Sequence, residues 1–289
     1  MKKPLILGLV CVVMACFAAN SVATRYLVNG QWLDPAAVTI TRFAAGAIML
    51  ALILVIQGRS RDALPRRTDM PLIIFLAAYA IAIAYGYRHI TAAAGTFVFY
   101  AFVVVTMAAG GSRPTFRATA GALVALGGVA LLAFGRVKGT TPLGVFLLAL
   151  TGVTWGAYSL RLRKRGAPLA TNARAFVGIA LLLPLLVWVE RDALVWSPVG
   201  LIIGLGMGAI TTALAYALWA RVLPMLTPME AGTFQLLVPV LTATAGVVLL
   251  AEPFTLQLGI AGTLVLLGMG LTTQRRVPQA KTRQPSRPI

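Results

Sequence analysis

Two arginines, Arg42 and Arg174, lie inside apolar stretches that are long enough to cross a membrane. A charged side chain surrounded by hydrocarbon is costly, and it usually pairs with another polar group or marks the path of a solute or ion. A long side chain near the end of a helix can instead extend to the lipid headgroups. Two interpretations therefore stay open for each arginine: extension to the headgroups, or a polar role such as gate pairing or carboxylate attraction.

Hydroxyl and aromatic side chains follow one face of two predicted helices. The spacing i, i+4, i+7 is occupied by Thr151, Trp155 and Tyr158, and again by Thr212, Tyr216 and Trp219. Such a stripe can line an aqueous cavity that suits amphipathic or aromatic solutes. It can equally serve helix packing or the belt of aromatic residues at the membrane surface.

Other polar residues in apolar stretches must face protein or water, because lipid offers no hydrogen-bond partner. The candidate cavity residues are Asn20, Tyr79, Thr96, Tyr100, Trp155, Tyr158, Tyr216 and Gln235. Gln235 offers both a donor and an acceptor to a zwitterionic solute. Each of these side chains can instead bond a neighbouring helix. Pro239, in the middle of a predicted helix, is a candidate gating hinge, and a static kink is the alternative.

The composition predicts which elements hold these residues. With 59% hydrophobic and 11% charged residues in 289 positions, the chain has more apolar surface than a water-soluble core of this length would bury. A membrane-spanning helix needs about 20 apolar residues. We predict ten such helices, near residues 4–24, 35–57, 71–87, 91–109, 118–134, 142–160, 173–189, 198–219, 231–250 and 254–272.

The two halves of this pattern contain short identities in the same order. Leu72-Ile73-Ile74 returns as Leu201-Ile202-Ile203, and Arg42 with Gly46 returns as Arg174 with Gly178. Chance is the alternative, since apolar sequences use few residue types. Because five helices per copy is an odd number, a second copy would enter the bilayer inverted. We therefore predict an all-α membrane protein of ten transmembrane helices, built as two inverted five-helix repeats, residues 1–138 and 139–273, around a central cavity.

The basic residues predict how the helices are oriented. The net charge is +18 at pH 7, and most lysines and arginines fall in alternate connections. Cytoplasmic loops are the ones enriched in Lys and Arg, so we expect both termini in the cytoplasm. The basic tail, residues 274–289, is expected to be disordered. A cleavable signal peptide is the alternative for the first helix, but its loss would leave copies of four and five helices.

Several function classes lack the residues that they need. Nucleic-acid binding is not expected, because no recognition motif accompanies the scattered cations. No carboxylate falls at the centre of a predicted span, which disfavours coupling through a buried acid. Paired aspartates, an HExxH helix and a serine–histidine pair are missing from the sequence, so we expect neither an enzyme nor a metal or other cofactor. A pore is disfavoured because no ring of charged residues is evident.

Four short motifs carry a resemblance to known proteins. They are Pro35 followed by Arg42-Phe43, then Trp155-Gly156-Ala157-Tyr158, then Ala215-Tyr216 with Leu218-Trp219, and Glu252-Pro253 before Gly262. These motifs resemble those of the drug/metabolite transporter superfamily, specifically its EamA-type members with ten helices. The first copy departs from the pattern, because Phe17-Ala18 stands in place of Trp-Gly and Gly111-Ser112-Arg113 has no glutamate. Within the superfamily the chain is most similar to YddG-like exporters of aromatic amino acids.

The resemblance implies a basket-shaped bundle in which the first four helices of each copy surround the cavity and helices five and ten are peripheral. It implies a multi-pass secondary transporter of the bacterial inner membrane that functions as a monomer in the lipid bilayer. Such a transporter would export amino acids and related small metabolites by alternating access. A multidrug or nucleotide exporter of the same superfamily is the alternative.

Overall fold

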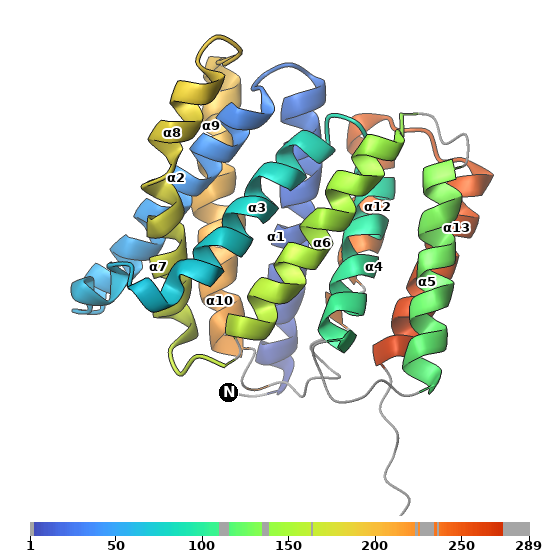
Figure 1. The fold of residues 1–289 in the computed structure, drawn as a ribbon, viewed down its shortest axis with the longest axis horizontal. Coiled ribbons are helices and arrows are strands. Elements are labelled where there is room, and N and C mark those ends of the chain that lie inside the picture. The colour runs from blue at the N-terminus through green and yellow to red at the C-terminus, as the bar shows by residue number, and fades with distance from the viewer. Residues whose placement is uncertain are drawn as a thin grey trace, which may run out of the picture.

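Helices account for all the regular structure in the described part of the chain (Figure 1). The computed structural model describes residues 3–109, 116–134, 139–162, 164–222, 225, 234–235 and 237–273. The first half contains α1 (Lys3–Asn29), α2 (Pro35–Ile56), the 3₁₀ turns η1 (Ser60–Ala63) and η2 (Arg67–Asp69), α3 (Met70–Gly86), α4 (Ala92–Ala109) and α5 (Phe116–Phe134). The second half contains α6 (Pro142–Leu162), α7 (Pro168–Ala180), α8 (Leu183–Glu190), α9 (Pro198–Gly206), η3 (Met207–Leu214), α10 (Ala215–Val222), α12 (Leu237–Leu250) and α13 (Leu256–Thr273).

Local sequence signals explain where several helices begin. Proline stands in the first turn of α2, α3, α7, α8 and α9, where its missing N–H needs no partner. Asp34 caps α2 by accepting hydrogen bonds from the backbone N–H groups of Ala36 and Ala37. Ser197 caps α9 in the same way through the N–H of Gly200.

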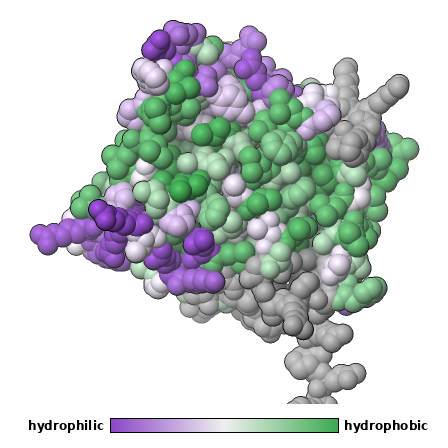
Figure 2. All heavy atoms as spheres, in the orientation of Figure 1, coloured by the Kyte–Doolittle hydropathy of each residue, from purple (hydrophilic) through white to green (hydrophobic). Residues whose placement is uncertain are grey.

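The helices have the length and the surface of a membrane protein. Six segments are long and apolar enough to cross a bilayer: Leu5–Asn29, Pro35–Ile56, Arg67–Gly86, Pro142–Leu162, Pro168–Glu190 and Pro198–Val222. Four shorter apolar helices are Ala92–Met107, Thr119–Leu132, Leu237–Leu250 and Leu256–Leu271. Each predicted span overlaps one of these segments. On the face shown in Figure 2, hydrophobic residues form a broad band, with hydrophilic residues gathered above and below it.

Two predicted boundaries are wrong by more than one helical turn. α1 continues to Asn29 instead of ending near residue 24, because Arg25 near its end is buried and has an ionic partner. α7 begins at Pro168 instead of near residue 173. Hydropathy excludes Thr171 and Asn172 from a membrane span, yet both are buried and hydrogen-bonded inside the bundle. Packing therefore extended both helices beyond their apolar stretches.

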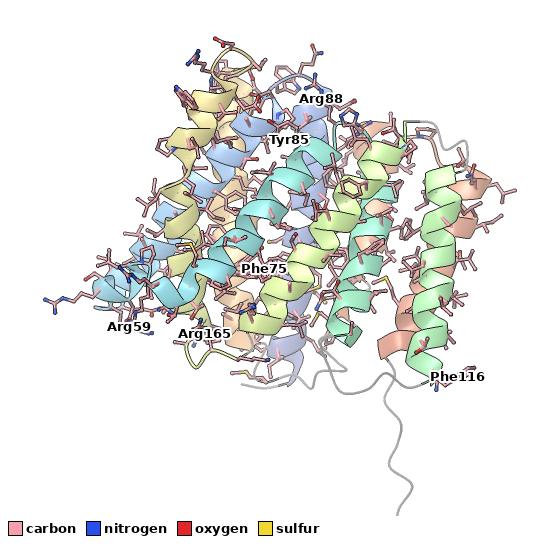
Figure 3. The ribbon with its side chains drawn as sticks, in the orientation of Figure 1. Arg59, Phe75, Tyr85, Arg88, Phe116 and Arg165 are labelled. Carbon is pink, nitrogen blue, oxygen red and sulfur yellow. The ribbon has the colours of Figure 1, made fainter. Side chains whose placement is uncertain are left out.

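The two halves of the chain interleave. α6 packs against α3 and α4, while α1 packs against α10, η3 and α12. α2 lies against α7 and η3, α3 also touches α7, and α5 pairs with α13 at one side of the bundle. α1 and α6 run in opposite directions, and the start of α1 and the end of α13 lie at the same end of the bundle (Figure 1). Arg59, Arg165 and Phe116 lie toward that lower end, and Arg88 lies at the opposite end (Figure 3).

The segment from Pro198 to Val222 changes its winding halfway. Between α9 and α10, η3 is a π-helix, a rare form that often occurs at functional sites. Gly208 in η3 lies directly against α2, where a Cβ atom would overlap the carbonyl oxygen of Arg42 and the Cβ of Ala45. Glycine at this position therefore lets η3 approach the backbone that carries Arg42.

Replacing Gly208 with alanine is expected to push η3 away from α2. Overpacking of this kind costs about 1–3 kcal/mol, so the detergent-purified protein should unfold at a lower temperature. Gly206→Ala is the matched control, because a Cβ there would have no atom within 4 Å. Alanine is also the better helix former, so the control should be neutral or stabilising. Equal melting temperatures for the two variants would contradict this account of the α2–η3 contact.

Candidate functional site

A cavity lies between helices of both halves of the chain. It is lined by Phe17, Asn20, Ser21, Arg42, Tyr79, Ile83, Phe99, Tyr100, Trp155 and Tyr216. α1 to α4 provide the first eight of these residues, whereas α6 and α10 provide the last two. The free space is about that of one water molecule. A solute as large as an amino acid can therefore enter only when the surrounding helices move apart.

Arg42 lies in the wall of this cavity and is only 2% exposed. Its Nε donates a hydrogen bond of 3.0 Å to Oγ1 of Thr212, and its Nη2 donates one of 3.1 Å to the hydroxyl of Tyr79. The guanidinium carbon also lies 5.3 Å from the centre of the Phe43 ring and 5.5 Å from that of Tyr79, where the ring quadrupoles attract a cation. The interpretation that Arg42 extends to the headgroups is therefore wrong.

Asn20 connects α1 to the π-helix η3. Its Nδ2 donates to the carbonyl oxygen of Thr211 at 2.9 Å, and its Oδ1 accepts from the hydroxyls of Thr211 at 2.6 Å and Thr212 at 3.1 Å. Since the Thr212 hydroxyl also accepts from Arg42, one chain of hydrogen bonds runs from α1 through η3 to α2 and on to Tyr79 of α3. This chain fixes the position of the guanidinium in the cavity wall.

Aromatic rings form the rest of the wall around Trp155. The Trp155 ring centre lies 5.2 Å from that of Tyr79 and 5.2 Å from that of Tyr216, and Phe17 contacts both Trp155 and Tyr216 edge to face. Tyr100 lies against Phe99, with ring centres 4.6 Å apart. Such rings offer flat apolar contact area to a solute and negative ring faces to a cationic group.

Three of the predicted cavity residues are not among the lining residues. Thr96 is buried, donates to the carbonyl oxygen of Ala92 and shares a hydrogen bond with the hydroxyl of Tyr87. Tyr158 stacks behind Trp155 and donates to Oδ1 of Asn172 at 2.5 Å. Gln235 is half-buried and does not line the cavity. By contrast, Asn20, Tyr79, Tyr100, Trp155 and Tyr216 line the cavity together.

Pro239 is buried at the third position of α12 (Leu237–Leu250). Phe234 and Gln235, which precede it, are also helical. Proline has no N–H with which to bond the carbonyl oxygen of Gln235, four residues earlier. A hinge at Pro239 stays a prediction.

Arg174 is buried as an ion pair, so extension to the headgroups is wrong for this residue too. Its Nε lies 2.7 Å from Oδ2 of Asp69, and its Nη2 donates to the hydroxyl of Thr171. Asp69 is fully buried, and the same Oδ2 atom accepts from the backbone N–H of Arg66. This pair joins α7 to the start of α3, near the lower end of the bundle in Figure 1.

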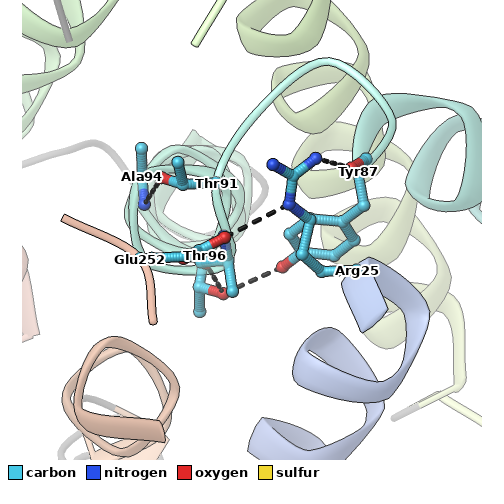
Figure 4. A network of polar contacts seen from close by, with 7 residues as sticks. Arg25, Tyr87, Thr91, Ala94, Thr96 and Glu252 are labelled. Carbon is cyan, nitrogen blue, oxygen red and sulfur yellow. Dashed lines mark hydrogen bonds and ion pairs between the residues drawn. The ribbon is translucent and has the colours of Figure 1, made fainter. Parts of the chain in front are cut away.

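A second buried ion pair joins Arg25, near the end of α1, to Glu252, which lies between α12 and α13 (Figure 4). The end of α1 is at the opposite end of the bundle from the start of α3 (Figure 1). Nε of Arg25 lies 3.2 Å from Oε1 of Glu252, and Nη1 of Arg25 donates to the carbonyl oxygen of Tyr87. The Glu252 carboxylate also accepts from the backbone N–H of Ala92 at 2.9–3.0 Å, so it caps the start of α4. Arg25 directly follows the first predicted span, residues 4–24, and this pairing was not predicted from the sequence.

Sequence reasoning also missed several cavity residues. Phe17, Ile83 and Phe99 line the cavity but stood out by neither charge nor spacing. Ser21, a polar residue in an apolar stretch, also lines the cavity. Thr212 was part of a predicted stripe, and the adjacent Thr211 could have been found as a second hydroxyl in an apolar helix. Among the described residues, no three His, Cys, Asp or Glu side chains gather as a metal site would require.

Known proteins similar to this chain include transporters. The profile of the EamA-like transporter family matches residues 142–274. A protein of Pseudomonas aeruginosa is 34% identical over 92% of this chain and 94% of its own length. A transporter of Archaeoglobus fulgidus is 25% identical over 96% of this chain and 100% of its own length. The threonine/homoserine exporter RhtA of Escherichia coli is 32% identical over 52% of each chain.

A solved structure has the same overall fold. One crystal structure superposes with a TM-score of 0.65 at 17% identity, covering 91% of this chain and 95% of its own. At this identity the likeness concerns the fold alone. This fold agrees with the family profile, with the full-length relatives and with the apolar helices around a central cavity. The chain therefore belongs to the EamA-like transporter family of the drug/metabolite transporter superfamily.

Proposed function

We propose that this protein is a secondary transporter that exports amino acids and related small metabolites across the bacterial inner membrane by alternating access. The observation that carries the proposal is the polar and aromatic cavity in the middle of an apolar bundle, with walls from both halves of the chain. In this proposal the protein works as a monomer, its ten helices all span the bilayer, and both termini are cytoplasmic.

The helix contacts support two inverted repeats, residues 1–138 and 139–273. Exchanging α1 with α6, α2 with α7, α3 with the η3–α10 segment, α4 with α12 and α5 with α13 turns several major contacts into others that are present. The α1–α12 contact becomes α6–α4, the α1–η3 contact becomes α6–α3, and the α2–η3 contact becomes α7–α3. The α2–α7 and α5–α13 contacts map onto themselves. Inverted repeats that meet at a central site are a recurrent basis of alternating access.

The two buried ion pairs support a transport cycle with two gates. Arg25–Glu252 lies at the end of α1, and Arg174–Asp69 joins α7 to the start of α3, so the two pairs lie toward opposite ends of the bundle (Figure 1). Alternating access requires that contacts at one end break while those at the other hold. In the proposed cycle these two pairs are the contacts that break in turn.

A counterflow assay in proteoliposomes tests the proposed activity. Vesicles that contain the full chain and are preloaded with unlabelled threonine should take up labelled threonine at matched pH and without an ion gradient. The residues that line the cavity include no carboxylate, so the proposed mechanism has no proton-binding step at an acid there. Protein-free vesicles are the control. Uptake that depends absolutely on a proton gradient would overturn the uncoupled mechanism.

A competition assay separates the substrate classes. The similarity to a threonine/homoserine exporter favours small amino acids, while the aromatic wall favours aromatic ones. We expect excess threonine and excess tryptophan to reduce labelled threonine uptake, and a cationic dye to leave it unchanged. Inhibition by the dye alone would favour a multidrug exporter of the same superfamily instead.

A further inference from the structure

Three arginines are buried in the described part of the chain, and one of them differs from the other two. Arg25 has Glu252 as its ionic partner, and Arg174 has Asp69. Arg42 is the least exposed of the three, yet no described carboxylate lies within 4.0 Å of its guanidinium. An unpaired buried charge is costly, so this arrangement needs a physical explanation.

The surroundings of Arg42 compensate its charge only in part. A guanidinium carries five N–H donors and stays protonated in proteins. Two of these donors are used, toward Thr212 and Tyr79, and two aromatic rings lie beside the charge. No described atom accepts a hydrogen bond from Nη1 of Arg42. The Arg42 side chain also borders the cavity. The positive charge and its spare donors are therefore available to an occupant.

We propose that Arg42 binds the carboxylate group of the transported solute. A carboxylate is the group that a guanidinium binds best, because two parallel N–H···O bonds can form. The substrates are then small carboxylates with zero or negative net charge, zwitterionic amino acids among them. Cations are rejected, because the lining residues include a buried positive charge and no acid. This inference rests on the proposed transport function and adds the chemical class of its substrates.

The first test uses the unaltered full chain and a matched series of ligands. Thermal stabilisation in detergent is measured with threonine, threonine methyl ester, and the hydroxy acid that lacks the ammonium group. Charged hydrogen bonds contribute about 1.5–3 kcal/mol, so the ester should bind about tenfold to a hundredfold more weakly than threonine. The hydroxy acid should still bind. Equal stabilisation by threonine and its ester would overturn the proposal, whatever any variant does.

The second test removes the guanidinium. Arg42→Gln should weaken threonine binding and raise its half-saturation concentration in counterflow by about tenfold or more, while Arg42→Lys should retain part of the affinity. Arg42→Gln should also abolish the preference for threonine over its ester, which a general loss of stability would not do. Arg61→Gln, which removes an exposed positive charge, is the control. Unchanged affinity and preference in Arg42→Gln would contradict the proposal.

The outcomes distinguish this inference from the proposed function. If threonine is transported but the ester competes equally well, amino-acid export stands and the role of Arg42 fails. If the hydroxy acid binds in an Arg42-dependent way but no amino acid is transported, the role of Arg42 stands and amino-acid export fails.

Discussion

Asp69→Asn is expected to destabilise the protein more than any other single change of a carboxylate to its amide. The substitution leaves Arg174 buried without its counter-ion, and breaking a buried ion pair from one side costs about 3–5 kcal/mol. The new amide would still offer one oxygen to the backbone N–H of Arg66, so the loss is chiefly that of the charge. Unfolding of the detergent-purified chain, followed by temperature or denaturant, measures the effect.

The same loop provides a matched control. Asp62 pairs with Arg59 and Arg66, but its side chain is 34% exposed, and surface pairs contribute about 0–1 kcal/mol. Asp62→Asn should therefore change stability little. The double variant Asp69→Leu with Arg174→Met should recover most of the lost stability, because both charges are removed from the interior. Equal loss from Asp62→Asn and Asp69→Asn would contradict the special role of the buried pair.

Glu252→Ala is expected to have an effect at least as large, at the opposite end of the bundle. It leaves Arg25 without its carboxylate, at a cost of about 3–5 kcal/mol. It also removes the oxygens that accept from the N–H of Ala92 at the start of α4, and losing such a cap costs about 0.5–2 kcal/mol. The melting temperature in detergent and the susceptibility of the folded protein to proteolysis should both report the loss.

Glu252→Gln separates the two contributions of this side chain. The amide keeps an oxygen for the N–H of Ala92 but loses the charge that pairs with Arg25, so its effect should fall between that of Glu252→Ala and the unaltered protein. Asp192→Asn is the control, since this carboxylate is 91% exposed. If Glu252→Gln were as stable as Asp192→Asn, the ion pair would contribute nothing and only the cap would remain.

The membrane class and the approximate helix positions followed from the sequence. Hydrophobic length is a local property, so each predicted span overlaps an apolar helix of the structure. The prediction was wrong where polar residues continue a helix into the packed interior, as at Arg25 in α1 and at Thr171 in α7. At these positions a residue from another helix or loop forms a hydrogen bond or ion pair with the polar side chain. Hydropathy averaged over neighbouring residues does not detect such a distant residue.

The candidate site could be predicted only in part. Tyr79, Tyr100 and Trp155 stood out because polar and aromatic groups are few in apolar helices, and they line one cavity. Tyr158 follows Trp155 by three residues in α6, so the sequence predicted both side chains in the cavity wall. In the structure the Tyr158 ring stacks behind Trp155 and its hydroxyl donates to Asn172. The π-helix η3, which brings Thr212 to Arg42, has no signature in the periodicity of the sequence.

Composition and hydropathy alone indicate an apolar, helical membrane protein, and they place one arginine in the second predicted helix of each half. The folded bundle gives these two arginines different surroundings. Arg174 meets Asp69, which is 105 positions away, whereas Arg42 meets Thr212, which is 170 positions away, and no described acid. Burial makes the energy of a charge depend on its nearest polar neighbours, and packing between distant helices determines which residues those neighbours are.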